Sequence, residues 1–320
     1  MSFKILGTGS CLPQRSVSNS ELSEFLDTSD EWIQQRVGIN ERRVCTTETT
    51  ADIAIGAAKG ALEMSGTTPD ELDMILCATV SADHTTPSLA CSVQSMLGAT
   101  CPAMDVNAAC SGFIYMLETA AGFFAIGYKK ILIIGAERLT RVVDWTDRST
   151  AVIFADGAGA MVLAPGSSYI SSKLVAKGGD TVLSIPSFGG QSPFYKNKSL
   201  KPYVHMNGQE VFKFAVNAMC TDLADVIEKA GLTIEDIAWI VPHQANARII
   251  DAAVRKLNIP PERCLKNIET TGNTSAASVA ILADELFRSG KLKDGDYIAM
   301  AAFGAGLTSA ACIIKWETQH

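Results

Sequence analysis

With 320 residues, the chain is long enough for one large domain or two similar halves, and its net charge of −7 argues against nucleic acid as the main partner. Hydrophobic residues make up 47% of the chain and charged residues 19%, which predicts that much surface is buried, in a subunit interface as well as in a core. No apolar stretch approaches the length of a membrane span and no signal peptide is visible, so we expect a cytoplasmic protein without a membrane partner.

Apolar segments typical of strands buried on both faces alternate with Ala-rich segments typical of helices. The predicted strands cover residues 5–8, 74–79, 103–106, 131–135, 160–164, 237–241, 297–302 and 310–315. The predicted helices cover residues 51–64, 88–97, 112–126, 210–230, 247–257 and 275–289. Because the two kinds of segment alternate, we expect an α/β protein whose helices cover its sheets.

Two Gly/Ala-rich turns suggest that the chain contains two related halves. One turn begins at Asp156 and the other at Gly304, and each leads into an apolar strand. A chance resemblance between two such turns is the alternative. We place the boundary so that residues 1–168 form the first half and residues 169–320 the second. Residues 178–203 are rich in Gly, Ser, Pro and Lys and are expected to lie outside both cores.

The nine cysteines include no Cys-x-x-Cys pair, so the sequence predicts neither a metal site nor a disulfide framework. Cys110 differs from the others because it opens a predicted helix of small residues. The partial positive charge of a helix N-terminus favours the thiolate, which is the nucleophilic form of cysteine. A cysteine that only fills space in an Ala-rich segment is the alternative.

Two later residues can act together with this cysteine. His243 ends an apolar strand, and Asn273 lies between Gly272 and a predicted helix. A structural histidine and a helix N-cap are the alternatives. Cys110, His243 and Asn273 all follow strands or begin helices, where open α/β sheets place their sites.

The three residue types fit two kinds of chemistry. Hydrolysis would use the histidine as a general base, oriented by the asparagine. In carbon–carbon bond formation on a thioester, the cysteine would hold an acyl group. A neutral His243 and Asn273 would then donate hydrogen bonds to the enolate of a second substrate as it loses carbon dioxide. Backbone N–H groups of Cys110 and of the turn at residues 303–306 would form an oxyanion hole.

Two further groups of residues suggest binding surfaces. Trp32 and Arg36 lie at positions i and i+4 of a predicted helix, a spacing that suits a flat ring and a phosphate, and Arg148 lies in a polar loop that adds a phosphate contact. A surface helix with a half-buried tryptophan is the alternative. A second set is basic and surrounds the predicted helix after His243, where an acidic protein can dock or the helix face is simply solvated: Lys213, Arg248, Arg255 and Lys256.

The chain resembles the β-ketoacyl-acyl carrier protein synthase III family, the initiating condensing enzymes of bacterial type II fatty acid synthesis. The resemblance covers nearly the whole length. It rests on these motifs: the opening Gly-x-Gly-x-x-Leu-Pro, Thr28-Ser29-Asp30-Glu31-Trp32-Ile33 with Arg36 and Gly38-Ile39, Ala109-Cys110-Ser111-Gly112-Phe113, Asp156-Gly157-Ala158-Gly159-Ala160, Gly208-x-Glu210-Val211-Phe212, Pro242-His243-Gln244-Ala245-Asn246, and Gly272-Asn273-Thr274. It implies a thiolase-like fold of two similar halves in five α-β-α-β-α layers, and an obligate homodimer.

The resemblance also implies a reaction. Cys110 would take an acyl group from acyl-CoA and condense it with malonyl-acyl carrier protein, releasing carbon dioxide, while His243 and Asn273 would stabilise the enolate. No resident cofactor is expected, because acyl-CoA is a substrate. The remaining implied roles are CoA ring and phosphate contacts at Trp32, Arg36 and Arg148, a pantetheine tunnel at Thr28, Gly208 and Asn246, and carrier-protein docking at Lys213, Arg248, Arg255 and Lys256.

The sequence departs from the family pattern at two positions. The best-known acetyl-selective members carry a bulky Phe before the Pro of a loop that crosses the dimer and caps the acyl pocket, whereas this chain has Thr86 before Pro87. A smaller residue predicts room for branched or longer starters. Ala305 stands in the late turn where many members have Gly, and we expect no consequence because the oxyanion hole uses only its backbone N–H.

Other families with related chemistry fit less well. Thiolases use a second catalytic cysteine in the late turn, which is absent here; hydroxymethylglutaryl-CoA synthases rely on an added glutamate, and plant-type polyketide synthases differ in the motifs around the three residues. A relative that primes polyketide or other secondary-metabolite assembly stays open as the alternative. A papain-like hydrolase is disfavoured by the Cys-Ser-Gly-Phe setting, and a non-catalytic scaffold would not need all three residues.

Overall fold

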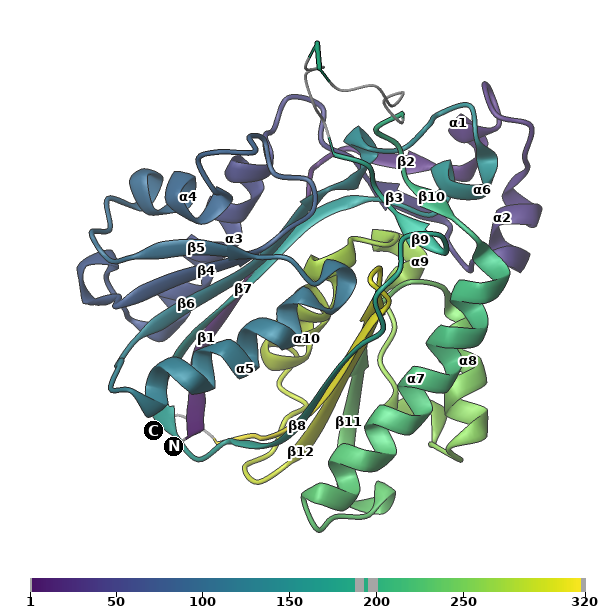
Figure 1. The fold of residues 1–320 in the computed structure, drawn as a ribbon. Coiled ribbons are helices and arrows are strands. Elements are labelled where there is room, and N and C mark those ends of the chain that lie inside the picture. Colours follow the sequence, from purple (N-terminus) through teal and green to yellow (C-terminus); the bar gives the residue numbers. More distant parts are fainter. Residues whose placement is uncertain (1, 188–192, 195–200, 318–320) are drawn as a thin grey trace.

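The computed structural model describes residues 2–187, 193–194 and 201–317. Most of the strands in this part of the chain belong to two mixed sheets (Figure 1). The first sheet has the order β1-β7-β6-β4-β5, in which β4 is parallel to both β5 and β6 and the other pairs are antiparallel. Its strands are β1 (Ser2–Cys11), β4 (Met74–Ala78), β5 (Ala103–Val106), β6 (Ile131–Arg138) and β7 (Asp156–Gly166).

The second sheet has the order β11-β12-β13-β8, in which only β11 and β12 are parallel. Its strands are β8 (Tyr169–Ala176), β11 (Ile237–Pro242), β12 (Tyr297–Gly304) and β13 (Thr308–Lys315). The chain passes from the first sheet to the second between Gly166 and Tyr169. Two small two-stranded sheets pair β2 (Ser16–Ser18) with β3 (Glu41–Arg43) and β9 (Leu183–Ser184) with β10 (His205–Met206).

The helices and sheets form five layers. Helices α5 (Gly112–Ala125) and α10 (Ser278–Arg288) lie between the two sheets (Figure 1). Helices α3 (Thr50–Ser65) and α4 (Leu89–Leu97) cover the outer face of the first sheet, and α7 (Gly208–Lys229) and α8 (Ala247–Lys256) cover the outer face of the second. The described part of the chain also contains the short helices α1 (Asn19–Leu22), α2 (Asp30–Arg36), α6 (Arg148–Ala151) and α9 (Ile268–Thr271).

Alternation along the strands explains the layers. In β4, Met74 and Leu76 face the central helices, whereas Ile75 and Cys77 face α3 and α4. Successive side chains of a strand point to opposite faces, so an almost wholly apolar strand packs against helices on both sides. The predicted α/β architecture is confirmed. No helix in the described ranges is both long and apolar enough to cross a membrane.

Two glycines let the central helix α10 and the turn before it lie directly on the first sheet. A Cβ atom at Gly135 of β6 would lie 2.5 Å from the carbonyl oxygen of Ala276, and one at Gly159 of β7 would lie 2.5 Å from the Cβ of Ala280. Only glycine fits such a close approach. The 3₁₀ turn η6 (Ser275–Ala277), which leads into α10, is therefore held against the end of β6. This contact positions one wall of the candidate site.

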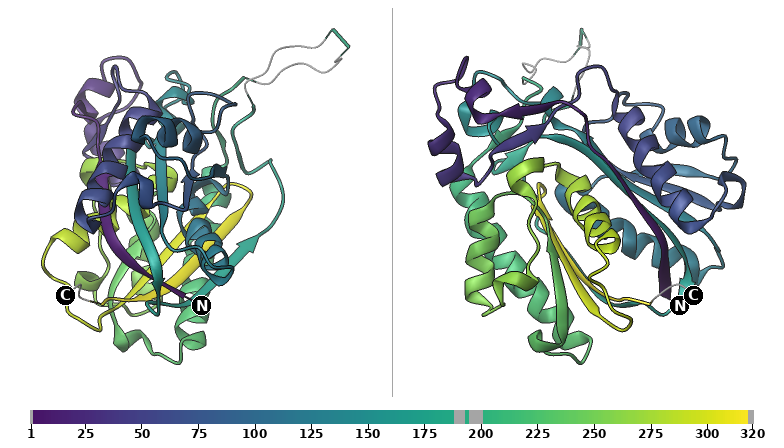
Figure 2. Two further views of the ribbon diagram at one scale, coloured as in Figure 1. Left: turned by 90° about the vertical axis from the view of Figure 1, so that its left-hand side faces the viewer. Right: turned by 180° about the vertical axis from the view of Figure 1, so that it is seen from behind.

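The start of β1 and the end of β13 both contact the crossing from the first sheet to the second, and Figure 2 shows the two sheets from two further sides. The hydroxyl of Ser2 donates to the carbonyl of Tyr169, and the backbone N–H of Lys315 donates to the carbonyl of Ser168. The crossing from the first sheet to the second is thus anchored to both ends of the chain.

Candidate active site

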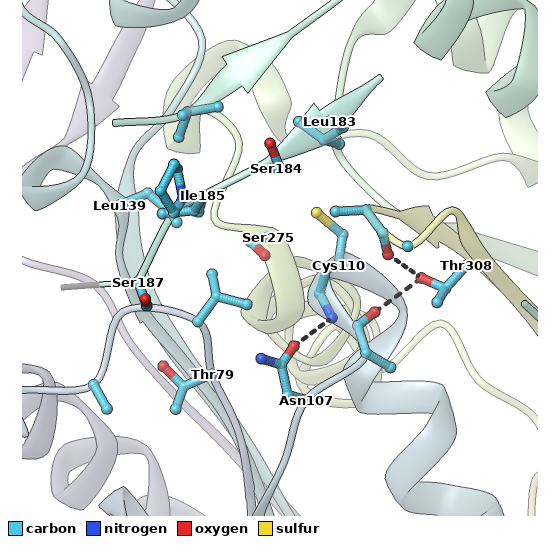
Figure 3. A pocket seen from close by; sticks show the side chains of 18 of the residues that line it. Thr79, Asn107, Cys110, Leu139, Leu183, Ser184, Ile185, Ser187, Ser275 and Thr308 are labelled. Atoms are coloured by element: carbon cyan, nitrogen blue, oxygen red, sulfur yellow. Dashed lines mark hydrogen bonds between the residues drawn. The ribbon is translucent and has the colours of Figure 1, made fainter. Parts of the chain in front are cut away.

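Cys110 lies in the 3₁₀ turn η2 (Ala109–Ser111), directly before α5. Ala109 has a φ of 48°, a left-handed conformation that non-glycine residues rarely adopt. The backbone N–H of Ala109 donates to Oδ1 of Asn107 at 3.3 Å, and the hydroxyl of Thr308 donates to the carbonyl of Ala108 at 3.0 Å (Figure 3). The turn is strained and held from both sides, as is common at functional sites.

A cavity of about 740 Å³ opens beside Cys110. Figure 3 shows the Cys110 side chain across from the segment Leu183–Ser187. The first part of residues 178–203, a segment expected to lie outside both cores, thus helps to enclose this cavity, as does Val204 directly after that segment. Residues 188–192 and 195–200 lie outside the described residues. The loop after β4 contributes Thr79 and His84 to the wall, and the segment between β6 and β7 contributes Leu139 and Phe154. Ser275, in the turn directly before α10, and Ala305, directly after β12, also line the cavity.

Burial, rather than the helix N-terminus, controls the charge of Cys110. The pKa of its thiol is raised to about 12, mainly by desolvation; a hydrogen bond with the Ser275 side chain lowers this pKa, and the nearby Glu137 carboxylate raises it. The sequence-based expectation of a favoured thiolate is therefore wrong for the unliganded site. The raised pKa favours the protonated thiol, so the predicted role as nucleophile requires a group that accepts its proton.

His243 follows β11 and is buried next to the end of β12. Its backbone N–H donates to the carbonyl of Ala301 at 2.8 Å, its Nδ1 lies 2.6 Å from the hydroxyl of Ser278, and its ring meets that of Phe303 edge-on at 5.2 Å. Burial lowers the pKa of His243 to about 3. The imidazole is therefore neutral at physiological pH, as condensation chemistry requires.

Asn273 is fixed through its backbone and its side-chain oxygen. Its N–H donates to the carbonyl of Ile153 at 3.0 Å, and its carbonyl accepts from Ala155 at 2.9 Å. Its Oδ1 accepts from the N–H of Ser275 at 2.8 Å. Because the oxygen is engaged, the amide presents its NH₂ end as the available donor. The preceding Gly272 has a φ of 69°, which favours glycine.

One short segment brings the three residues together. Within residues 273–278, Asn273 itself is buried, Ser275 hydrogen-bonds the Cys110 thiol, and Ser278 contacts the His243 ring. The end of β12 contacts both Cys110 and His243 from the other side. A Cβ at Gly304 would lie 2.7 Å from the backbone nitrogen of Cys110, and the neighbouring Phe303 packs on the His243 ring. Cys110, Ser275 and Ala305 line the cavity, whereas His243 and Asn273 are not among the residues that line it and connect to its wall through residues 275–278.

Comparison with known proteins identifies the family. Residues 104–178 match the model described as 3-oxoacyl-[acyl-carrier-protein (ACP)] synthase III, and residues 227–316 match the model of its C-terminal part. The β-ketoacyl-[acyl-carrier-protein] synthase III of Caldanaerobacter subterraneus subsp. tengcongensis is 47% identical, over 98% of this chain and 97% of the relative. The chain belongs to the β-ketoacyl-[acyl-carrier-protein] synthase III family.

Solved structures show the same fold. The 3-oxoacyl-[acyl-carrier-protein] synthase III of Aquifex aeolicus is 43% identical, with 98% of this chain and all 100% of the relative covered and a TM-score of 0.92. The priming β-ketosynthase of the R1128 polyketide pathway is 35% identical, covers 99% and 96%, and has a TM-score of 0.91. The thiolase-like fold implied by the resemblance is confirmed. The family models and the higher identity to synthase III enzymes favour fatty acid synthesis over the polyketide alternative.

Three of the residues predicted to contact CoA form a cluster. The Trp32 ring lies 5.9 Å from the guanidinium carbon of Arg36 and 5.1 Å from that of Arg148, distances typical of cation–π contacts. Nδ2 of Asn246 donates to the carbonyl of Arg36 at 3.1 Å, which ties this cluster to the loop that carries His243. Gly208 is the first residue of α7.

The other predicted residues lie on the surface or at its edge. Thr28 has a buried hydroxyl without a hydrogen-bond partner among the described residues. Thr86 is exposed and is not among the residues that line the cavity, although the preceding His84 and Thr85 do line it. The basic residues are all exposed, with the Arg248 guanidinium 5.7 Å from the Phe212 ring: Lys213, Arg248, Arg255 and Lys256.

Sequence reasoning missed three polar residues of this synthase III site. Ser275 and Ser278 read as parts of a helix start, although their spacing after Asn273 places both on the segment that joins the three residues. Glu137 reads as the polar end of an apolar strand, but it is completely buried next to the site. The signal in the sequence was a charged residue close to the end of a strand that is otherwise apolar, because charged residues are rarely buried without a reason.

Proposed function

We propose that the chain condenses an acyl-CoA starter with malonyl-acyl carrier protein, with loss of carbon dioxide and through an acyl group held on Cys110, to initiate fatty acid synthesis. The observation that carries the proposal is the joining of Cys110, His243 and Asn273 by residues 273–278 beside a cavity of about 740 Å³. One nucleophile and two neutral donors suit a decarboxylative condensation better than a hydrolysis.

His243 and Asn273 are suited to stabilise the enolate. The Ser278 hydroxyl accepts from the N–H of Gln244 at 3.4 Å and so can donate to Nδ1 of His243, which leaves the proton of the neutral ring on Nε2. The NH₂ group of Asn273 is the second donor. Two donors held in a buried site are already oriented when negative charge develops on the thioester oxygen.

The oxyanion hole for acyl transfer is assigned to the backbone N–H groups of Cys110 and Ala305. The close approach of Gly304 to the Cys110 backbone brings the late turn against η2. The Thr308 hydroxyl contacts both backbone segments, at the carbonyls of Ala108 and Ala305, each at 3.0 Å. These contacts fix the two backbone segments relative to each other.

The cluster of Trp32, Arg36 and Arg148 is the proposed site for the CoA nucleotide. The indole face suits an adenine ring, and the guanidinium groups suit phosphates. Thr28, Gly208 and Asn246 are assigned to the pantetheine tunnel. Asn246 supports this assignment because it joins the nucleotide cluster to the His243 loop.

The carrier protein is proposed to dock on the exposed basic residues of α7 and α8. Arg248 stacks on Phe212 next to Lys213, whereas Arg255 and Lys256 lie about two turns further along α8. An acidic partner bound there would be guided by charge toward the end of α8 that follows the His243 loop.

We propose a homodimer that forms along β5. This strand is at an edge of the first sheet, and its Met104 is 38% exposed, next to α4, where Met96 is 46% exposed. The Thr86 loop lies between β4 and α4, so a second copy at this edge would bring the partner subunit's equivalent loop near the cavity. Thr86 is thereby assigned to the acyl-pocket gate. Nine unpaired cysteines support a reducing, cytoplasmic location.

The test uses mass spectrometry of the protein after incubation with a panel of acyl-CoAs, followed by addition of malonyl-acyl carrier protein. The wild type is expected to gain one acyl mass on Cys110, as is the control variant Cys91→Ala, whose residue is exposed on α4 and is not among those that line the cavity. Cys110→Ala should gain none. His243→Ala should acylate but not condense.

Two outcomes would contradict the proposal. Absence of acylation in the wild type, or equal acylation of Cys110→Ala, would remove the assigned nucleophile. Undiminished condensation by His243→Ala would show that the enolate is stabilised elsewhere.

A further inference from the structure

Glu137 is a completely buried carboxyl group near the end of β6. Its Oε2 accepts three hydrogen bonds: from the N–H of Val80 at 3.0 Å, from the hydroxyl of Thr79 at 3.2 Å and from the hydroxyl of Ser81 at 2.5 Å. Its Oε1 has no hydrogen-bond partner among the described residues. A buried polar atom without a partner is costly, so this oxygen calls for an explanation.

The Glu137 side chain lies on the face of β6 that packs against η6. Gly135 and Glu137 are two residues apart and therefore share a strand face, and Gly135 is in close contact with the backbone of Ala276 in η6. The hydroxyl of Ser275, the first residue of η6, lowers the pKa of Glu137 and also that of Cys110. Ser275 lines the cavity together with Cys110 and with Thr79, whose hydroxyl donates to Glu137, and Figure 3 shows Ser275 next to Cys110 in the cavity wall.

We propose that Glu137 receives the Cys110 thiol proton through the Ser275 hydroxyl during acyl transfer and returns it after condensation. The inference rests on the proposed function. In the first step the Cys110 sulfur bonds to the acyl carbon, the bond from that carbon to the CoA sulfur breaks, and the CoA thiolate takes a proton from solvent. In the second step the malonyl-derived carbanion bonds to the acyl carbon, carbon dioxide leaves, and the released Cys110 thiolate regains its proton from Glu137.

This route keeps the buried charge constant. The site holds one negative charge on Glu137 at rest and one on Cys110 during attack, so no second charge has to be buried. Burial raises the pKa of the Glu137 carboxyl to about 7, whereas burial lowers that of His243 to about 3, so the carboxylate is the stronger of the two bases.

The other charged groups at this end of β6 are engaged elsewhere. Arg138 pairs with Asp83 at 3.4 Å, and Asp156 on the neighbouring β7 accepts from the Thr140 hydroxyl at 2.7 Å and from the N–H of Cys45 at 2.8 Å. Glu137 is therefore the acidic group that faces η6 and acts on the Cys110 thiol.

The test measures the single-turnover rate of Cys110 acylation by acyl-CoA as a function of pH. For the wild type, the rate should rise with pH with a midpoint near 7, because Glu137 must be ionised to accept the proton. Glu137→Gln should acylate about 10²- to 10⁴-fold more slowly and lose this midpoint, the loss typical of removing a general base. Glu137→Asp should recover part of the rate and keep a midpoint.

Two variants separate this role from a purely structural one. Ser275→Ala leaves the carboxyl in place but interrupts the path, so it should also lose the midpoint; it serves as the test if Glu137→Gln does not fold. Glu118→Gln is the matched control, because Glu118 accepts from the hydroxyls of Tyr169 and Ser172 away from the cavity. It should keep the wild-type profile. A Glu137→Gln or Ser275→Ala variant with the wild-type midpoint overturns the inference, whereas a wild type that never acylates overturns the proposed function instead.

Discussion

At the scale of single residues, burial outweighs every other influence on the charges of the site. A helix N-terminus stabilises a nearby anion by up to about 2 kcal/mol. Full desolvation shifts a pKa by up to about 3–5 units, or roughly 4–7 kcal/mol. The larger effect explains why the pKa of Cys110 is raised although η2 leads into a helix. Sequence position alone predicts Cys110 as the nucleophile but does not predict its protonation state, because burial depends on segments distant in the sequence.

The neutral state of His243 has a consequence for acid stability. Its folded pKa of about 3 lies below the ordinary value of 6.5, so as the pH falls from 6.5 toward 3 the unfolded chain takes up a proton that the folded chain refuses. The wild type should therefore lose stability relative to His243→Gln by up to about 1.4 kcal/mol per pH unit in this window. Urea unfolding near pH 7 and near pH 5 measures the difference. The exposed His205→Gln is the control and should follow the wild type; an identical response of His243→Gln would contradict the assigned neutral state.

At the scale of elements, the sequence predicts the segments whose own pattern is strong. The expected strand at residues 74–79 and helix at residues 112–126 correspond to β4 and α5 within a residue. β8 was missed because it is an edge strand with mostly exposed or half-buried side chains, so no apolar run marks it. The three-residue strands β2 and β3 form only because each pairs with the other.

The same division applies to the site. Cys110, His243 and Asn273 could be named from motifs, since each follows a turn signal that the sequence displays. Ser275 and Glu137 could not, because their roles arise from the packing of η6 against β6. That packing depends on the absence of a side chain at Gly135, and a single glycine in an apolar strand does not reveal which element it contacts.

The contact at Gly135 gives a prediction at this scale. Gly135→Ala would place a methyl group 2.5 Å from the Ala276 carbonyl oxygen, so η6 must shift. We expect a loss of about 1–3 kcal/mol in unfolding free energy and slower Cys110 acylation. Gly122→Ala in α5 is the matched control, because nothing lies within 4 Å of its added methyl group, and it should gain about 0.5–1 kcal/mol. Denaturant unfolding together with the acylation assay measures both effects, and normal acylation in Gly135→Ala would show that η6 tolerates displacement.

At the scale of the whole molecule, the first sheet ends in a strand that a second copy can extend. Edge strands present unpaired backbone groups, and soluble proteins usually cover them. Pairing of β5 with its copy would cover this edge and the exposed side chains of Met96 and Met104 together. The apolar composition of the chain agrees with such an interface.

This arrangement predicts that Met104→Glu weakens self-association. Two like charges would face each other near the two-fold axis, so the variant should be largely monomeric at concentrations where the wild type is a dimer. Light scattering after size-exclusion chromatography measures the mass. Ile126→Glu is the control, because Ile126 is 75% exposed at the end of α5 and not on β5. Equal masses for wild type and Met104→Glu would move the interface elsewhere.

The position of residues 273–278 makes the proposed site depend on the folding of the whole chain. This segment is held against β6 of the first sheet, while its Ser278 holds a histidine that extends from β11 of the second. Neither sheet with its own helices contains a complete reaction centre. An incompletely folded or cleaved chain therefore has the Cys110 thiol without the other residues of the proposed site, so we expect acyl transfer only from the completely folded chain.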